Sequence, residues 1–313
     1  MKPMTRTARS AAALGAGLLL LLTACGGGSG GGDAKSDGEL SGAKLSVGSK
    51  EFTESIVLAQ ITAVALENAG ATVQDKTGIS GSATVREALE SKQIDMYWDY
   101  TGTGWVNILG NTTKDVPQDL YAAVSKADAK NGIAWLEPAP FDDTYRIAVP
   151  TSFSKEHGIT TMSQAADYIN DHPGDSNVCA ASEFINRDDG LPGVEKAYGF
   201  TFGKTVELDL NLIYPQIGEA CSFGEVFSTD ARIVSNDLTV LDDDKKFFVE
   251  YQGALTLRQE TLDRYPAIAD IMKPISAALT NEVVTELNGK VDNDGEKPRD
   301  VAEDWLKDSG LVD

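Results

Sequence analysis

The sequence predicts an α/β fold of two lobes with a ligand cleft between them. Short apolar segments of strand character alternate with amphipathic helical segments, and this alternation occurs in two successive blocks joined by strand-like crossings. About 270 residues follow residue 43, enough for one large or two modest domains. We expect one lobe over 44–147, completed by 248–313, and the other over 148–247.

The first block begins with a short strand and an apolar helix. Helical spacing of Ile56, Ala59, Ala63 and Leu66 predicts a helix that stops at Gly70. The remaining expected elements of this block are strands at 45–48, 72–79 and 94–98 and helices at 53–68 and 84–91. The Thr-Gly-Thr-Gly run at 101–104 therefore follows a strand, and ligands gather at the carboxyl ends of strands in open α/β sheets.

The second block repeats the same alternation and ends in helical segments. Its expected strands are 145–150, 177–181 and 205–210, and its expected helices are 163–170, 193–198 and one from about residue 214. Helical patterns follow at 266–279 and 301–306.

The N-terminus has the pattern of an export signal. A basic head precedes an apolar run over 11–22, which is too short to span a bilayer and typical of a signal peptide. Leu22-Thr-Ala-Cys25 resembles the lipobox of bacterial lipoproteins, which implies removal of 1–24 and a diacylglycerol on Cys25. The alternative is an ordinary secretory peptide with an incidental cysteine. Residues 25–43 read as the lipidated cysteine and a flexible Gly/Ser linker.

The charge of the chain excludes some partners. The net charge is −21, and it becomes −24 without 1–24, which carry three positive charges and no negative ones. Nucleic-acid binding needs a basic footprint, so we exclude it. An acidic surface is repelled by anionic lipid, so membrane attachment has to come from the anchor. We expect a monomer fixed to the outer face of the cell membrane.

Two cysteines remain after Cys25. In an exported protein, Cys179 and Cys221 are expected to form a disulfide. The competing interpretation is a catalytic thiol at Cys179 with His157 or His172 as its base. The sequence contains no zinc-protease, P-loop or C-x-x-C motif and no histidine pair at metal spacing, so we expect no enzyme activity, cofactor or metal.

Short motifs in a fixed order carry the strongest functional signal. They are Gly48–Glu54 (GSKEFTE), Ala88–Asp95 (ALESKQID), Tyr100–Thr103 (YTGT), Phe141–Tyr145 (FDDTY), Arg187–Gly190 (RDDG) with Tyr198-Gly199, Phe227–Asp230 (FSTD) and Phe247–Tyr251 (FFVEY). Together they resemble the substrate-binding proteins of ABC importers for quaternary amines, the glycine betaine/choline/carnitine family. The resemblance implies a fold like that of type II periplasmic binding proteins and a permease with a separate ATPase as partners.

The resemblance also implies the site. A trimethylammonium group has no N–H to donate, and aromatic faces hold it at ~0.5–2 kcal/mol per contact. The family's cage falls on four aromatic residues of this chain: Tyr100, Tyr145, Phe227 and Tyr251. The family usually has tyrosine at the Phe227 position, so a hydroxyl is missing here. Asp143 matches the acidic neighbour of the cation, and the positions that hold a betaine carboxylate match three residues: Lys50, Thr103 and Arg187.

Other interpretations of these residues remain. Each tyrosine is compatible with half-buried packing, Lys50 with a solvated loop charge, and Arg187 with an ion pair to Asp188 or Asp189. Tyr97 and Trp98 are expected to pack in the sheet. The rival functions are a binding protein for another small zwitterion such as an amino acid, the thiol enzyme already mentioned, and a sensing domain without a transporter.

Overall fold

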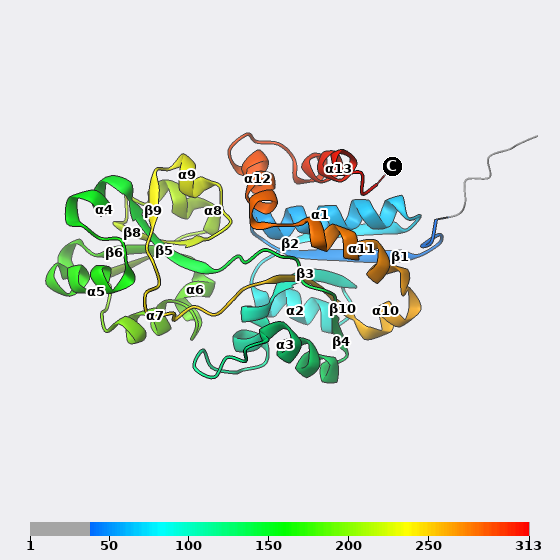
Figure 1. Ribbon diagram of the computed structural model, residues 1–313, viewed down its shortest axis with the longest axis horizontal. Coiled ribbons are helices and arrows are strands. Elements are labelled where there is room, and N and C mark those ends of the chain that lie inside the picture. Colours follow the sequence, from blue (N-terminus) through cyan, green and yellow to red (C-terminus); the bar gives the residue numbers. More distant parts are fainter. Residues whose placement is uncertain (1–37, 313) are drawn as a thin grey trace, which may run out of the picture. The chain divides into compact units, whose positions relative to one another are not determined.

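The computed structural model describes residues 38–312, and these form two five-stranded sheets. The first sheet has the order β2-β1-β3-β10-β4 and the second β7-β6-β8-β5-β9. Each sheet is covered by helices, and Figure 1 shows the two halves side by side. We call the half built on the first sheet the first lobe and the other half the second lobe. The predicted α/β class with two lobes is confirmed.

The sheet of the first lobe contains both parallel and antiparallel strands. β1 pairs in parallel with β2 and β3, and β10 runs antiparallel to β3 and β4. Its strands are β1 (Lys44–Lys50), β2 (Thr72–Ile79), β3 (Met96–Tyr100), β4 (Ile133–Trp135) and β10 (Gly253–Arg258). Its helices are α1 (Thr53–Asn68), α2 (Ser82–Glu90), the π-helical η1 (Thr103–Ile108), α3 (Leu120–Asp128), the 3-10 turn η2 (Ala129–Asn131), α10 (Gln259–Arg264), α11 (Ala267–Ala278), α12 (Asn281–Asp292) and α13 (Pro298–Asp308).

Helix α1 lies at the centre of the first lobe. Nearly all of its side chains from Thr53 to Leu66 are buried, on every face of the helix. A helix that is apolar all round has to be enclosed on all sides. The C-terminal helices provide this cover, because α12 and α13 lie against α1 on the side away from the sheet (Figure 1). The C-terminal segment therefore completes the lobe that the N-terminal segment begins.

The sheet of the second lobe also contains both parallel and antiparallel strands. β5 runs antiparallel to β8 and β9, while β6 pairs in parallel with β7 and β8. Its strands are β5 (Tyr145–Pro150), β6 (Asn177–Ala180), β7 (Lys204–Glu207), β8 (Phe223–Phe227) and β9 (Leu238–Val240). Its helices are α4 (Thr151–His157), α5 (Met162–Asp171), the 3-10 turn η3 (Pro173–Asp175), α6 (Ser182–Asn186), α7 (Leu191–Tyr198), α8 (Leu210–Ile213), the 3-10 turn η4 (Tyr214–Gln216) and α9 (Arg232–Ser235).

Two chain segments, 136–144 and 241–252, connect the lobes. They lie side by side, since Asp142 and Gln252 form an antiparallel bridge and the Asp143 N–H donates to the Tyr251 carbonyl at 3.1 Å. The expected boundary near residue 147 falls inside β5, which belongs entirely to the second sheet because its register with β8 begins at Tyr145. The boundary near 247 falls within the second connecting segment.

The helix expected from about residue 214 is wrong. The chain is helical only through α8 and the 3-10 turn to Gln216, and a bridge between Ile217 and Cys221 follows. Gly218 has φ +97°, a conformation that L side chains rarely adopt and that cannot continue a helix. The disulfide between Cys179 and Cys221 is present and fixes this turn to β6.

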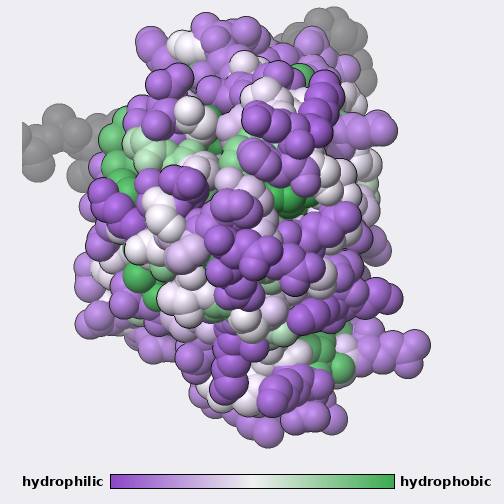
Figure 2. Space-filling model, turned by 90° about the vertical axis from the view of Figure 1, so that its left-hand side faces the viewer, coloured by the Kyte–Doolittle hydropathy of each residue, from purple (hydrophilic) through white to green (hydrophobic). Residues whose placement is uncertain are grey.

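The outer end of the second lobe, which faces the viewer in Figure 2, is mostly hydrophilic, with hydrophobic residues in small separate groups. This agrees with a chain of which 24% is charged. No helix among residues 38–312 is both long and apolar enough to cross a membrane.

Candidate functional site

A cleft of about 1160 Å³ lies between the lobes. Its lining contains all eight residues that the sequence pointed to: Lys50, Tyr100, Thr103, Asp143, Tyr145, Arg187, Phe227 and Tyr251. They come from the ends of β1, β3 and β8, the starts of β5 and η1, the turn after α6 and the two connecting segments, which lie far apart in the sequence. The topology therefore brings together side chains that only the ordered motifs had linked.

The aromatic rings in the cleft contact one another in a continuous series. The ring centroids of Tyr145 lie 4.9 Å from those of Phe227 and 5.3 Å from those of Tyr251. Phe52 continues the series, because its ring stacks on Phe227 at 5.2 Å and lies 6.0 Å from Tyr100. Both lobes and a connecting segment thus contribute rings to one aromatic cluster.

Phe52 was missed by the sequence analysis, although it stands in the GSKEFTE motif. It stands two residues after β1 and directly before α1. Phe52 lies four residues before Ile56, and this helical spacing is enough to explain an apolar side chain that packs against the helix. The sequence pattern therefore gave no sign that Phe52 lines the cleft.

The Thr-Gly-Thr-Gly run shapes the wall beside Tyr100. A Cβ atom at Gly102 would lie 2.7 Å from the Tyr251 ring, and one at Gly104 would lie 2.7 Å from Val124. Glycine is needed at both positions because neighbouring side chains approach the backbone closely. Tyr97 and Trp98 are fully buried in the sheet, as expected, and neither lines the cleft.

The two basic residues of the cleft are engaged by acids of the chain. The Lys50 ammonium lies 2.8 Å from Asp99 and 5.0 Å from the Tyr100 ring centroid. It is 4% exposed, so the interpretation as a solvated loop charge is wrong.

Arg187 is held by two carboxylates. Its Nε and Nη2 donate to Asp189 at 2.8 and 2.6 Å, and its Nη1 donates to Glu183 at 2.6 Å. The guanidinium also lies 5.5 Å from the Tyr145 ring centroid. The hydroxyl of Tyr251 donates to Asp189, so this carboxylate ties the arginine to the aromatic cluster. The alternative interpretation, in which Arg187 pairs with a neighbouring aspartate, is therefore observed.

Thr103 and Asp143 are both buried at the first-lobe side of the cleft. Thr103 opens the π-helical turn after β3. Asp143 stands on the first connecting segment and lies within hydrogen-bond distance of the Thr229 hydroxyl, at 2.6 Å. Burial and the charge of Glu54 raise the pKa of Asp143 well above its usual range.

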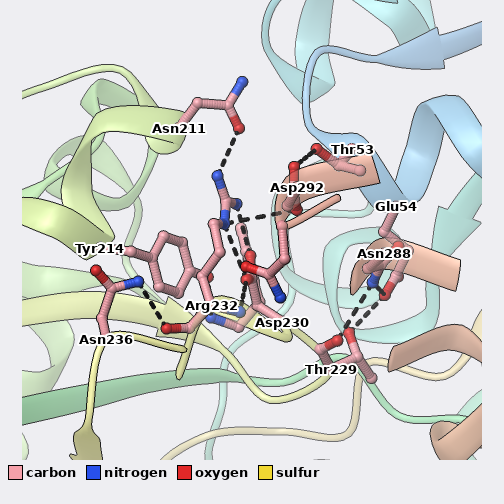
Figure 3. A network of polar contacts seen from close by, with 12 residues as sticks. Thr53, Glu54, Asn211, Tyr214, Thr229, Asp230, Arg232, Asn236, Asn288 and Asp292 are labelled. Carbon is pink, nitrogen blue, oxygen red and sulfur yellow. Dashed lines mark hydrogen bonds and ion pairs between the residues drawn. The ribbon is translucent and has the colours of Figure 1, made fainter. Parts of the chain in front are cut away.

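Glu54 forms a buried carboxyl pair with Asp143 across the Thr229 hydroxyl. Figure 3 shows Glu54 beside Thr229 and Asn288. Its carboxyl group accepts from the Tyr100 hydroxyl at 2.7 Å and from the Asn288 amide at 3.3 Å. The Thr229 hydroxyl has one proton, so one of the two carboxyl groups has to be protonated for both of its contacts to be hydrogen bonds. Burial raises the pKa of Glu54 accordingly.

A second polar group joins the lobes next to this pair. Arg232 of the second lobe pairs with Asp230 at 2.6 Å and reaches Asp292 of α12 at 3.5 Å, and its guanidinium stacks on Tyr214. Thr53 donates to the same Asp292 at 2.6 Å. Figure 3 shows these side chains converging from both lobes. With Thr229 they line a small cavity that shares Phe52, Asp143 and Phe227 with the cleft.

Two further acidic residues of the cleft, Glu183 and Glu225, were missed by the sequence analysis. Glu183 accepts from the backbone and hydroxyl of Ser82 across the lobes at 2.9 and 2.6 Å. Burial opposes its charge, but the charges of Lys50 and Arg187 outweigh burial and hold the pKa of Glu183 at about 2. Glu225 is 1% exposed, and burial raises its pKa to about 8.

The thiol-enzyme interpretation is wrong, because Cys179 is bonded to Cys221 and fully buried. His157 and His172 instead lie on the second lobe, next to the Tyr168 ring at 4.8 and 4.4 Å. Within 38–312 no group of three His, Cys, Asp or Glu residues could hold a metal ion. Cys25 and the signal segment lie outside the described residues.

The fold and this cleft define a two-lobed solute-binding protein. Residues 43–308 match the family described as the substrate-binding domain of ABC-type glycine betaine transport systems, and the chain belongs to this family. Members of this family are extracytoplasmic binding proteins of transporters.

Relatives and a solved structure agree with this assignment. The chain is 33% identical to a glycine-betaine-binding protein of Pseudomonas aeruginosa, over 86% of this chain and 89% of that protein. It is 32% identical to the ergothioneine transport permease/binding protein EgtU of Helicobacter pylori, over 85% of this chain and 48% of that protein, so it spans about half of that relative. The structure of apo YehZ from Escherichia coli matches with a TM-score of 0.63 and 28% identity, over 86% of this chain and 99% of that one.

Proposed function

We propose that this chain captures a quaternary-ammonium solute in the aromatic cluster and delivers it to an ABC permease, without enzyme activity of its own. The observation that carries the proposal is the convergence of Phe52, Tyr100, Tyr145, Phe227 and Tyr251 in one interlobe cleft. Aromatic faces are what a trimethylammonium group requires, and several contacts are needed for the ~8 kcal/mol of micromolar binding.

Closure of the lobes follows from the same arrangement. Tyr100 stands on the first lobe and Phe227 on the second, so a ligand that contacts both stabilises the closed state relative to the open one. Tyr100 donates a hydrogen bond to Glu54, and Glu54 in turn contacts Thr229 of the second lobe. The position of the Tyr100 ring is therefore coupled to the contact between the lobes. The closed form is the one we expect the permease to receive.

The anchor is part of the proposal. We infer from the lipobox that Cys25 carries the lipid and that the protein is monomeric and fixed to the outer face of the cell membrane. Mass spectrometry of the mature protein extracted from membranes should find a diacylglyceryl group on Cys25, and Cys25→Ala should release the protein. Full-length protein with an unmodified Cys25 would contradict the lipoprotein inference.

Calorimetric titration of the chain from Gly26 onward tests the binding function. This chain contains the whole compact unit Asp37–Asp313. Glycine betaine, choline, carnitine and ergothioneine are the ligands to try, and micromolar or tighter binding of any of them is the expected result. Amino acids form the comparison set for the rival zwitterion function. A correctly folded protein that binds an amino acid but none of the four would contradict the proposal.

Two variants locate the site. Tyr100→Ala removes one ring and should weaken binding by ~2- to 30-fold, the range that corresponds to one cation–π contact. Tyr265→Ala is the matched control, because Tyr265 lies in the first lobe outside the cleft. Equal losses in the two variants would show that the effect of Tyr100 is a loss of stability.

A further inference from the structure

One carboxylate of the second lobe makes a two-point contact with the first lobe. Glu183 on α6 accepts from the Ser82 N–H at 2.9 Å through Oε2 and from the Ser82 hydroxyl at 2.6 Å through Oε1. Ser82 is the first residue of α2. Because α2 and α6 belong to different lobes, a hinge opening that separates the lobes breaks both hydrogen bonds.

Helix α2 has no capping side chain from its own lobe. The residue before it is Gly81, which has φ +83° and no side chain to accept a hydrogen bond. The first N–H groups of a helix have no partner within the helix, and a negative charge is favoured beside them. Glu183 supplies both the acceptor and the charge for Ser82, so the second lobe caps a helix of the first.

Glu183 is ionised and fixed on its own lobe. Burial opposes its charge, but the charges of Lys50 and Arg187 outweigh burial and hold its pKa at about 2. Arg187 also donates to Oε1 of Glu183 at 2.6 Å. At neutral pH the side chain is therefore a carboxylate, and hydrogen bonds to an ionised acceptor are stronger than those between neutral groups.

The second-lobe half of this contact is joined to the aromatic cluster through Arg187. The guanidinium that holds Glu183 lies 5.5 Å from the Tyr145 ring centroid. Its other partner, Asp189, accepts from the Tyr251 hydroxyl. Two rings of the cluster and the Glu183 carboxylate therefore share one rigid group.

The first-lobe half is joined to the cluster in a similar way. The Glu51 carboxylate accepts from the Ser80 hydroxyl and the Gly81 N–H, each at 3.2 Å, and thereby fixes the loop that leads into Ser82. Glu51 precedes Phe52, whose ring belongs to the cluster. Both halves of the contact are thus held next to the place where the rings meet.

We propose, on the basis of the function above, that Glu183 is a positioning residue that holds the lobes closed through Ser82 and raises the affinity for every ligand of the cleft by the same factor. The contact is made between two residues of the protein and forms on closure. Its free energy therefore adds to that of ligand binding whichever ligand is present.

A double-mutant cycle measured by calorimetric titration tests the inference. The four proteins are the chain from Gly26 onward and its Ser82→Ala, Glu183→Ala and doubly substituted variants. The ligands are tetramethylammonium, choline and glycine betaine, which share the cation and differ at the other end. Ser82→Ala should weaken each ligand by ~10-fold, with factors that agree within ~3-fold. In the Glu183→Ala background the same change should weaken binding by less than ~3-fold, because its partner is gone.

The dissociation rate separates a closing contact from a structural one. Loss of the contact should raise the dissociation rate of the ligand by ~10-fold in stopped-flow fluorescence and leave the association rate within ~3-fold, because closure follows entry of the ligand. The urea midpoint of ligand-free Ser82→Ala should match that of the unsubstituted chain. Ser182→Ala is the matched control, since Ser182 is an exposed neighbour of Glu183 on α6 whose hydroxyl makes no hydrogen bond within 38–312. It should change no affinity by more than ~3-fold.

Several outcomes would overturn the inference and leave the proposed function standing. They are independent effects of Ser82→Ala and Glu183→Ala, a Ser82→Ala effect that depends on the ligand, a change confined to the association rate, and a lowered urea midpoint of ligand-free Ser82→Ala. Failure of all three ligands to bind folded, unsubstituted protein would overturn the proposed function and the inference with it. If Glu183→Ala does not fold, the equal factors and the dissociation rate of Ser82→Ala decide.

Discussion

Glu225→Gln should change how the stability of the ligand-free protein depends on pH. The pKa of this carboxyl group is about 8 in the folded protein, against an ordinary value of 4.5, because burial disfavours its charged form. Between these two pH values the folded state holds a proton on Glu225 that the unfolded state releases. The free energy of unfolding therefore falls as the pH rises through this window.

The magnitude follows from the width of the window. Each pH unit between the two pKa values costs about 1.4 kcal/mol, so Glu225 removes up to about 5 kcal/mol of stability between pH 4.5 and pH 8. Glutamine has no proton to lose. The stability of Glu225→Gln relative to the unsubstituted chain should rise by ~1.4 kcal/mol per pH unit over this range and level off above pH 8.

Urea unfolding at constant ionic strength from pH 5 to pH 9, followed by circular dichroism, measures this difference. Glu207→Gln provides the comparison for a Glu→Gln change at an exposed position of the cleft. A constant offset between Glu225→Gln and the unsubstituted chain across the pH range would refute the reasoning, since it would show that Glu225 is ionised in the folded state throughout.

Three other changes have expected outcomes. Phe227→Tyr keeps the ring face and should leave tetramethylammonium affinity within ~3-fold by calorimetry, while Phe227→Ala should lower it by ~10-fold. Reduction of the Cys179–Cys221 disulfide, which closes a sequence separation of 42, should lower the free energy of unfolding in urea by about 4 kcal/mol. Arg232→Ala leaves two buried carboxylates without their cation and should cost roughly 3 kcal/mol in thermal or urea unfolding. Arg299→Ala, in a half-exposed pair, should cost at most ~1 kcal/mol.

Each of these has a result that would count against it. Equal affinities of Phe227→Ala and the unsubstituted chain would remove Phe227 from the site. Reduction without loss of stability would mean that β6 and the turn before β8 stay together without the bond. Equal losses of unfolding free energy in Arg232→Ala and Arg299→Ala would show that the ion pairs of Arg232 stabilise the protein no more than an exposed ion pair does.

Local sequence patterns were sufficient where a single element determines its own structure. The bounds expected for α1, β2 and β5 are those observed, because apolar spacing, a terminal glycine and a β-branched run act within one segment. They failed after Tyr214, where apolar residues continue but Gly218 and the disulfide impose a turn. The lobe boundary expected near 147 lies inside β5, and only the pairing with β8 places the whole of β5 in the second sheet.

Four of the five aromatic residues and both basic residues of the cleft could be found in the sequence because they stand in an ordered set of motifs, as does Asp143. Glu54, Glu183 and Glu225 were not found, although Glu54 stands in the GSKEFTE motif. They are three of the 48 acidic residues of the chain, and nothing in their residue type separates them from the others. Their burial is produced by elements that are distant in the sequence, such as Thr229 and Asn288 for Glu54 and Ala181 for Glu225.

The sequence by itself determined the fold class and favoured the disulfide, and its resemblance to the family pointed to eight of the residues that line the cleft. The tertiary structure alone decided how those residues are paired. It showed that Lys50 and Arg187 are already paired with acids, that Glu54 and Asp143 both contact the Thr229 hydroxyl, and that Glu225 is buried. The charge available to a ligand depends on such distances and on burial, since both set the strength of every electrostatic interaction, and neither is written in the order of residues.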